Sequence, residues 1–430
     1  MHSLKSTPKK ENPIALQEMS HDAPLTNNND ELLPWHLGVF DAHCHPTDTM
    51  SSIAEIPQMK ARTLTVMSTR GEDQDLVYEA GVSIYAGNDD TKEDKRIRIL
   101  PCFGWHPWFS YQILLLDDNG TPGDPLSIDA ETKKAHYEKV LAPSPKDKPD
   151  GQQFITALPP PKPLSTFISE TRTRLLSHPS ALVGEIGLDR AFRLPNPWTQ
   201  EEIAARDSTI TPGSREGRTL SPYRVHLEHQ KSVLRAQLRL AGELQRPVSL
   251  HSVQAHGAVF DVLKELWTGY ERRVPTRRER RRRYSAAGAH EESDAEEDTQ
   301  QQQHNTISTN TKEEPEEKKP LPFPPRICMH SYSGPVDPVK QFLHPSNPSD
   351  VYFSFSNMIN FSGPSAQKVI EVVKVLPDER VLVESDLHMA GPVMDELLED
   401  VVRQICEIRG WGLIDGVRRL GDNWRRFVYG

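Results

Sequence analysis

The sequence predicts an α/β protein with a (β/α)8 barrel, the TIM-barrel fold, and three observations predict it. Eight short apolar runs follow one another from residue 37 onward, each aliphatic or β-branched without polar alternation. Helix-like segments separate many of these runs. Five of the runs end in, or carry, a histidine or a carboxylate. Eight strands that alternate with helices favour a closed parallel barrel, and an open doubly wound sheet is the alternative.

The eight expected strands are short and almost continuously apolar, as parallel strands buried on both faces are. In chain order the runs are GVFDAHCH (38–45), TLTVMST (63–69), RILPCFGW (98–105), ALVGEIG (181–187), PVSLH (247–251), RICMH (326–330), VYFSFS (351–356) and VLVESD (381–386).

The clearest expected helix covers residues 226–246. Its apolar residues recur at helical spacing, so that one face is apolar; they are Leu227, Leu234, Leu238 and Ala241. Three further segments, 164–177, 255–268 and 364–376, are also expected to be helical.

Several stretches do not fit the alternation of strands and helices. Residues 1–36 are polar, and we expect a disordered tail before a barrel domain that spans 37–430. Within that domain we expect insertions at 109–163 and 191–222, in loops after the third and fourth strands. Residues 271–325 combine a basic block, an acidic block, a glutamine run and a proline cluster, which predicts a disordered insertion.

The basic block ERRVPTRRERRRR (271–283) has two interpretations that the sequence leaves open. Such a block is typical of a nuclear-localisation or nucleic-acid-binding segment. Because EESDAEED (291–298) follows it, the two blocks also suit a solvated linker that neutralises its own charge.

Composition narrows the class of protein. The chain has 430 residues, a net charge of -10 and a mean hydropathy of -0.61. This acidic balance argues against a protein that coats nucleic acid, but not against a local site where metal ions supply positive charge. The four cysteines form no CxxC pair and are expected to be buried free thiols. With no secretory signal and no membrane-length apolar run, we expect a cytoplasmic or nuclear protein.

Polar side chains that are costly to bury stand at the ends of the apolar runs. The carboxyl ends of barrel strands converge on one face, where active sites lie. His43 and His45 are spaced i, i+2, so both point to the same side of a strand. Together the residues form a ligand set for one or two divalent metals: His43, His45, Glu185, His251, His330 and Asp386. A carboxylate such as Glu185 is able to bridge two ions.

Six ordered segments carry a family resemblance. They are DAHCHPTD (41–48), GWHPW (104–108), GEIGLDR (184–190), HQKSVLRAQLRLA (229–241), HSYSGP (330–335) and VLVESD (381–386). They resemble the motifs of TatD-type metal-dependent deoxyribonucleases, which belong to the amidohydrolase superfamily. The resemblance runs from about residue 38 to residue 428 and is strongest to a fungal branch named for interaction with a Cut-class subunit of the anaphase-promoting complex.

The resemblance implies roles for individual residues and two divalent metal ions, Zn, Mn or Mg. His43 and His45 would hold one metal with Glu185 and Asp386, and Glu185 would bridge to a second metal held by His251 and His330. Asp386 would orient the attacking water or accept its proton, so Glu185 and Asp386 would be catalytic. His106 would contact a substrate phosphate at the mouth, and Asn423 and Phe427 match the closing helix of the family. The implied reaction is hydrolysis of a phosphodiester in DNA.

Three positions carry alternatives. Arg190 stands where the family often has an aromatic residue, and would clamp a substrate phosphate or form a structural salt bridge. His388 follows Asp386 where the family has a Pro-Tyr-Leu-type stretch, and is either an extra ligand or a loop residue. His256 lies near the start of the next expected helix, with or without a substrate contact.

Two further functions stay open beside the deoxyribonuclease. The long insertions and the branch resemblance suit a non-enzymatic interaction protein built on the barrel. Related barrels also hydrolyse amides, lactones and phosphotriesters, so the fold and the metals leave the substrate undetermined.

Overall fold

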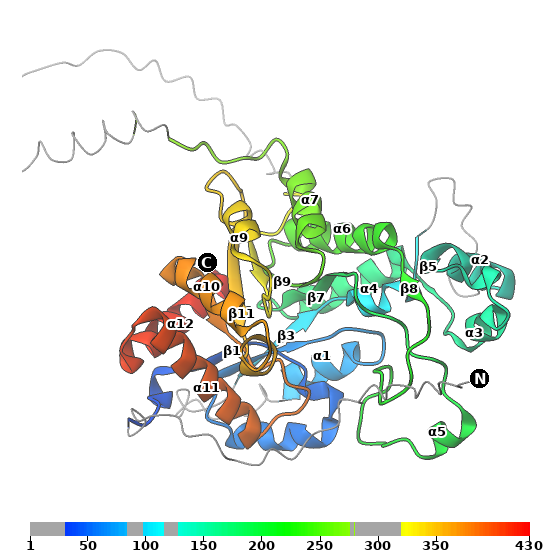
Figure 1. The fold of residues 1–430 in the computed structure, drawn as a ribbon, viewed down its shortest axis with the longest axis horizontal. Coiled ribbons are helices and arrows are strands. Elements are labelled where there is room, and N and C mark those ends of the chain that lie inside the picture. Colours follow the sequence, from blue (N-terminus) through cyan, green and yellow to red (C-terminus); the bar gives the residue numbers. More distant parts are fainter. Residues whose placement is uncertain (1–30, 84–97, 116–127, 276–278, 280–319) are drawn as a thin grey trace, which may run out of the picture.

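The structure is a computed structural model that describes residues 31–83, 98–115, 128–275, 279 and 320–430 (Figure 1). Its centre is an eight-stranded parallel sheet in the order β1-β2-β3-β7-β9-β10-β11-β12. Each strand overlaps the run expected in its place. The strands are β1 (Phe40–Cys44), β2 (Thr63–Met67), β3 (Arg98–Phe103), β7 (Leu182–Asp189), β9 (Val248–Val253), β10 (Arg326–Met329), β11 (Asp350–Phe355) and β12 (Val381–Val383).

The sheet closes into a barrel between its first and last strands. The backbone N–H of Asp386 donates to the carbonyl of His43 at 3.0 Å, and the N–H of His45 donates to the carbonyl of Leu387 at 2.7 Å. These bonds join the segment after β12 to the end of β1. The (β/α)8 fold class is therefore confirmed, and the open sheet is excluded.

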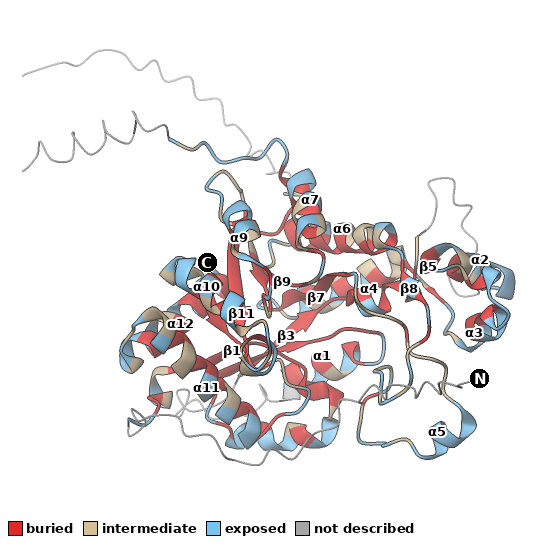
Figure 2. Cartoon of the chain, viewed as in Figure 1, coloured by how far each residue is buried: buried red, intermediate tan, exposed pale blue. Residues whose placement is uncertain are grey.

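Helices surround the barrel. Four form where the sequence predicts them: α4 (Leu164–Ser177), α6 (Leu227–Glu243), α7 (His256–Trp267) and α10 (Ala366–Val375). Also present are α1 (Gln74–Ser83), α9 (Val336–Phe342), α11 (Pro392–Arg409) and α12 (Leu413–Tyr429). The strands are buried, and exposed residues lie on the outward faces of the helices (Figure 2). Among the described residues, no helix is both long and apolar enough to cross a membrane.

The interior of the barrel is a packed core that α12 closes. Side chains from the strands form a cluster with three residues of α12, namely Trp424, Phe427 and Val428. The side-chain amide of Asn423 donates to the carbonyls of Asp378 and Val381 at 2.7 and 2.8 Å. Val381 begins β12, so α12 seals the amino ends of the strands and leaves their carboxyl ends open for a site.

The insertion after β3 forms a small lobe with a core of its own. Its described part contains β4 (Ile113–Leu114), α2 (Ala130–Val140), β5 (Leu141–Ala142), α3 (Gly151–Ala157) and β6 (Lys162–Pro163). Tyr137, Phe154 and Ile155 are buried in one cluster with Phe167 of α4 and Val233 of α6. This described part of the insertion is ordered, because its apolar side chains are buried against two barrel helices.

The predicted tail and third insertion lie largely outside the described residues, at 1–30, 276–278 and 280–319. The neighbouring segments are packed. Leu33 is buried, and Trp35–Leu37 form a 3-10 turn before β1. Phe323, inside the predicted insertion, is buried, and its backbone lies against Gly242 of α6. Residues from both predicted segments, Leu33 and Phe323, therefore belong to the core of the barrel domain.

The four cysteines are free and buried, as predicted. Burial raises the pKa of the thiols of Cys44 and Cys102 above the usual value. Both therefore stay protonated and act as small apolar residues of the core.

Candidate metal centre

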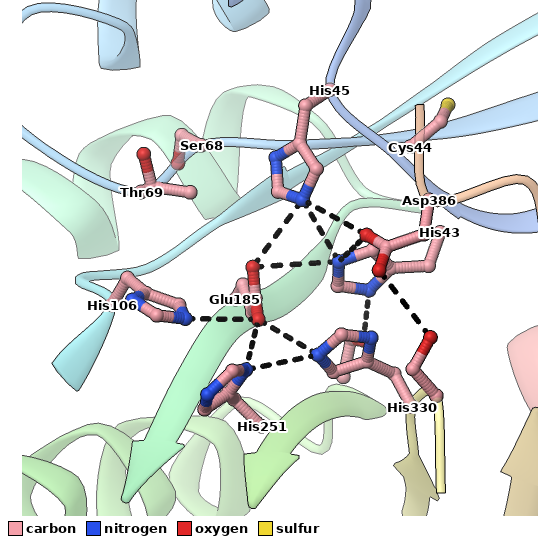
Figure 3. Close-up of polar contacts among 12 residues, drawn as sticks. His43, Cys44, His45, Ser68, Thr69, His106, Glu185, His251, His330 and Asp386 are labelled. Atoms are coloured by element: carbon pink, nitrogen blue, oxygen red, sulfur yellow. Dashed lines mark hydrogen bonds and ion pairs between the residues drawn. The ribbon is translucent and has the colours of Figure 1, made fainter. Parts of the chain in front are cut away.

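The six residues predicted as metal ligands lie together at the carboxyl ends of the strands (Figure 3). Two of them, Glu185 and His251, lie within strands, and the others lie near the end of a strand or after it. His43 belongs to β1 and His45 follows it, while Glu185, His251, His330 and Asp386 come from β7, β9, the end of β10 and the segment after β12. Barrel closure brings these distant segments to one face, where (β/α)8 enzymes carry their active sites.

Glu185 is the centre of the cluster. Its Oε1 lies 2.8 Å from Nδ1 of His251 and 2.8 Å from Nε2 of His330. Its Oε2 lies 3.4 Å from Nε2 of His43 and 3.4 Å from Nε2 of His45. Each oxygen of one buried carboxylate therefore faces its own pair of histidines, which is the arrangement of a carboxylate that bridges two cations.

The histidine nitrogens within each pair face each other. Nε2 of His43 lies 3.1 Å from Nε2 of His45, and Nδ1 of His251 lies 3.2 Å from Nε2 of His330. Two imidazole lone pairs repel at this distance unless a proton or a cation lies between them. Imidazole nitrogens with carboxylate oxygens are a donor set that Zn²⁺ and Mn²⁺ prefer. The residues present therefore fit divalent cations.

The donor atoms divide into two sets. Oδ1 of Asp386 lies 3.8 Å from Nε2 of His43 and 3.6 Å from Nε2 of His45, so these three residues would hold one cation with Glu185. Glu185, His251 and His330 would hold the other. This is the division that the family resemblance implies.

The carboxylates and His43 are held in the forms that bind cations. Burial alone would raise the pKa of Glu185, but the surrounding histidines, His106, His330 and His43, lower it well below the usual value. Burial alone would also raise the pKa of Asp386. The hydrogen bond from His45 is the largest of the effects that lower it, and the net pKa lies below the usual value. Burial and the neighbouring His330 lower the pKa of His43. The acids are thus ionised and His43 is neutral near pH 7. Burial opposes protonation of His45, His251 and His330, but the neighbouring carboxylates raise the pKa of all three, so a cation would displace a proton from each of them.

Three polar residues hold the histidines from behind. Oγ of Ser249 lies 2.8 Å from Nδ1 of His43, and Oδ2 of Asp189 lies 3.3 Å from Nε2 of His251. Oε1 of Glu384 faces Nδ1 of His330 at 3.6 Å, an ion-pair distance rather than a hydrogen bond. Partners of this kind orient metal-binding imidazoles and select their tautomer.

Asp189 and Glu384 are not among the residues predicted for the site, although both lie in the motifs GEIGLDR (184–190) and VLVESD (381–386). A signal was present for each. Asp189 is four residues after Glu185 on the same strand, so the two share a side of that strand, and Glu384 is two residues before Asp386 in the same motif. Residues at even spacing from a strand-end ligand are thus candidates for its support.

His106 is buried inside the cluster beside Glu185. It is 3% exposed, and its Nε2 lies 3.0 Å from Oε1 of Glu185. Its Nδ1 accepts the backbone N–H of Trp108 at 3.1 Å, so its proton sits on Nε2. Burial lowers the pKa of His106 to about 4, and the imidazole therefore stays neutral. It is a neutral hydrogen-bond donor directed into the cluster.

Three other predicted positions lie outside the central cluster. The side chain of Arg190 is exposed and forms no ion pair with any described residue. His256 begins α7, where its Nδ1 lies 2.9 Å from Oγ of Ser252, and it belongs to none of the clusters of metal-binding geometry among the described residues. His388 stacks on the ligand His45 at 5.2 Å between ring centroids, and its Nδ1 lies 2.7 Å from Oδ2 of Asp48.

The insertion after β7 follows the rim of the site. It leaves β7 at Asp189 and contacts the segment that follows β1, where the N–H of Thr211 donates to the carbonyl of Asp48 at 2.8 Å. The buried guanidinium of Arg70 donates to the carbonyl of Pro212 at 2.8 Å and to Asp48 at 2.7 Å. The insertion is therefore part of the wall of the mouth.

The chain is similar to two fungal proteins of known sequence. The chain is 34% identical over 391 residues to the Cut9-interacting protein scn1 of Schizosaccharomyces pombe, and the alignment covers 91% of this chain and 98% of that protein. It is 26% identical over 405 residues to an uncharacterized deoxyribonuclease of Saccharomyces cerevisiae, with 91% and 99% covered.

The chain is also similar to two solved structures. YJJV, a TatD homolog from Escherichia coli, has a TM-score of 0.44 at 17% identity, with 91% of this chain and 98% of that chain covered. An uncharacterized amidohydrolase from Saccharomyces cerevisiae has a TM-score of 0.48 at 12% identity, with 91% and 99% covered. The family model described as TatD related DNase matches residues 40–428. With this match over most of its length and a 34% identical relative in the same fungal branch, the chain belongs to the TatD family of hydrolases.

Proposed function

We propose that this TatD-family hydrolase is a divalent-metal-dependent deoxyribonuclease that cleaves phosphodiester bonds with an activated water. The observation that carries the proposal is the position of Glu185, whose two oxygens each face a separate pair of histidines. Two cations held on either side of one carboxylate are typical of enzymes that hydrolyse phosphate esters. Such cations would supply Lewis-acid activation of water and would offset the negative charge of the phosphate.

The residues of the chain perform the remaining steps. Asp386 lies at the open side of the first set of ligands, and its lowered pKa keeps it ionised. We assign it the role of accepting the proton of the attacking water at its carboxylate. Its backbone, at φ 56, is tied to the carbonyl of His43, so the carboxylate is held over the cluster.

His106 is the group best placed to contact the substrate. Its Nε2–H points at Oε1 of Glu185, and that oxygen already faces two histidines. We propose that this N–H turns to a non-bridging phosphate oxygen when substrate enters. A neutral donor stabilises the charge that develops on that oxygen without competing for a cation site.

Metal analysis and a nuclease assay on one preparation test the proposal. The full chain is loaded with Mg²⁺, Mn²⁺ or Zn²⁺ and offered single- and double-stranded oligonucleotides, phosphotriesters and lactones. We expect cleavage of DNA, and we expect Glu185→Gln to lose both bound metal and activity. Asp337→Asn, on the exposed surface of α9, is the matched control and keeps both.

The results separate the alternatives. Unchanged DNA cleavage in Glu185→Gln would refute the metal site. A metal-loaded wild-type chain that leaves DNA intact and opens a lactone or a phosphotriester would be a hydrolase of another substrate class.

We also propose that the chain binds a protein partner, a second role that is independent of catalysis. The supporting observation is its 34% identity, over 98% of that protein, to a relative named for interaction with Cut9. Capture of the corresponding anaphase-promoting-complex subunit by both the wild type and Glu185→Gln would support this role. Failure of the wild type to capture that subunit would contradict it.

A further inference from the structure

A buried carboxylate outside the two sets of ligands lies where the barrel closes. Asp41 belongs to β1, two residues before the ligand His43, and it is 0% exposed. Among the described residues, it belongs to none of the clusters of metal-binding geometry. A buried carboxylate is costly unless hydrogen-bond donors surround it, so the donors around Asp41 indicate its role.

Asp41 joins the two segments that close the barrel. Its Oδ1 accepts the backbone N–H of His43 at 3.0 Å and that of Ser385 at 3.1 Å, and its Oδ2 accepts the hydroxyl of Ser385 at 2.5 Å. Burial raises the pKa of Asp41 to about 7, and the hydrogen bonds from Ser385 and His43 oppose this rise. One side chain of β1 is therefore tied to a residue 344 positions later in the chain.

Ser385 stands directly before a residue with a strained backbone. The φ of Asp386 is 56°, in the left-handed region that residues other than glycine rarely adopt. Such strain persists only where the surrounding structure holds it. The hydroxyl of Ser385 accepts the backbone N–H of Leu387 at 3.3 Å while it donates to Asp41, so it fixes the residues on both sides of Asp386. The hydrogen bonds between Asp41 and Ser385, which we call the clamp, therefore support the backbone of Asp386.

The clamp lies beside one of the two expected cations. It joins the segments that carry His43 and Asp386, and these two residues share one set of donors; we call the cation of this set the first cation. Oδ1 of Asp386 lies 3.8 Å from Nε2 of His43, so a displacement of the segment after β12 would separate these donors. The ligands of the second cation come from β7, β9 and the end of β10, and among the contacts of the described residues none joins them to Asp41 or Ser385.

We propose that Asp41 is a positioning residue, which through the clamp and its bond to His43 holds the donors of the first cation together and sets the affinity of that site alone. The inference rests on the proposed metal-dependent deoxyribonuclease and assigns separate control to one of its two cations. Loss of a supporting partner typically weakens the binding of a metal ion roughly 10- to 100-fold. The same loss is therefore expected at the first site when the clamp is broken.

Counting bound ions in a variant of Ser385 tests the clamp. Ser385→Ala removes the hydroxyl donor and leaves every expected ligand in place. We expect it to bind the second Mn²⁺ ion with the affinity of the wild type and the first roughly 10- to 100-fold more weakly. Equilibrium dialysis of the metal-stripped full chain measures both affinities. At a Mn²⁺ concentration that fills both sites of the wild type, electron paramagnetic resonance should show a coupled pair of ions in the wild type and an isolated ion in the variant.

Further variants complete the test. Ser385→Thr keeps the hydroxyl and should restore the affinity for the first cation, whereas Asp41→Asn, which loses one acceptor oxygen, should weaken it as Ser385→Ala does. Ser349→Ala is the matched control, because Ser349 is a buried, hydrogen-bonded serine just before β11, at the amino ends of the strands. This control should bind both ions like the wild type. Thermal unfolding of each variant checks that the fold is retained.

The outcomes separate the positioning role from the nuclease. Equal losses of affinity at both sites in Ser385→Ala, or wild-type affinity at both, would overturn the positioning role while leaving the nuclease in place. The ions are counted without substrate, so a wild type that binds both ions and cleaves no DNA would refute the nuclease, and the ion counts would still decide the role of Asp41. A wild type that binds no more than one ion would refute both proposals.

Discussion

The hydroxyl of Ser249 lies 2.8 Å from Nδ1 of His43, although 206 residues separate them in the chain. Because Nε2 of His43 faces the other ligands, its lone pair must stay free for a cation and the ring proton must sit on Nδ1. His43 therefore donates to Ser249, and a residue of β9 selects the tautomer of a ligand on β1.

Replacing this hydroxyl should weaken metal binding without unfolding the barrel. In Ser249→Ala we expect the affinity for Zn²⁺ or Mn²⁺ to fall roughly 10- to 100-fold, as happens when a supporting partner of a metal-binding histidine is lost. Isothermal titration of the metal-stripped protein measures the change. Ser177→Ala, an exposed serine at the end of α4, is the control. An affinity equal to that of the wild type would show that Ser249 does not orient His43.

Asp386→Asn should separate proton transfer from substrate binding. The amide keeps the shape of the carboxylate but does not accept the proton of the attacking water. We expect kcat to fall about 10²- to 10⁴-fold with little change in KM. Steady-state kinetics on a single-stranded oligonucleotide at saturating metal measure this. A rise in KM with an unchanged kcat would assign Asp386 to substrate binding instead.

Arg70 links the second insertion to the barrel, and its removal should be strongly destabilising. Its guanidinium is buried and pairs with Asp48 at 2.7 Å and Asp73 at 3.1 Å. In Arg70→Met both carboxylates lose their cation inside the protein, so we expect a loss of about 3–5 kcal/mol in the free energy of unfolding.

Urea denaturation measures the loss, and limited proteolysis shows whether residues 191–222 become accessible. The control is Arg174→Met, which breaks an ion pair with the largely exposed Asp75 and should cost at most about 1 kcal/mol. Equal stability losses in the two variants would show that burial of the Arg70 pair has no energetic consequence.

Because His229 is buried, we expect the free energy of unfolding to fall in mild acid. Burial lowers its pKa from 6.5 to about 4, while its Nε2–H donates to the carbonyl of Ser110 at 2.8 Å. Between pH 6.5 and pH 4 the unfolded chain therefore binds a proton that the folded chain does not, and stability falls as the pH falls. The stability that neutral His229 contributes is fully present above pH 6.5. About 2 kcal/mol of it is lost by pH 5.

Urea unfolding at pH 7, 6 and 5 checks this dependence. His229→Gln keeps an N–H donor and removes the titration, so its stability should decline less with pH than that of the wild type. His344→Gln, an exposed histidine after α9, should decline like the wild type. Parallel declines in all three proteins would exclude His229 as a source of the pH dependence.

Local patterns explain why so much of the barrel is predictable. A strand buried on both faces requires a continuous apolar run, so all eight strands are visible in the sequence. The end of β7 shows the limit. The apolar run ends at Gly187, but the strand continues to Asp189, which pairs with Val253 of β9. Asp189 lies two residues beyond the apolar run, so the run does not mark it, and only its even spacing from Glu185 indicates that it faces the site.

The apolar runs and the polar residues at their ends determined the barrel and its six candidate ligands. Burying a histidine or a carboxylate is costly unless it is paired with another group or with a metal ion. Only the tertiary structure decided that His106 lies inside the cluster, that Ser249 and Asp189 hold its histidines, and that the insertion after β7 reaches the rim. These contacts join segments far apart in the chain and form only when the barrel closes. Sequence periodicity reports which face of an element is buried, and it carries no information on what lies opposite that face.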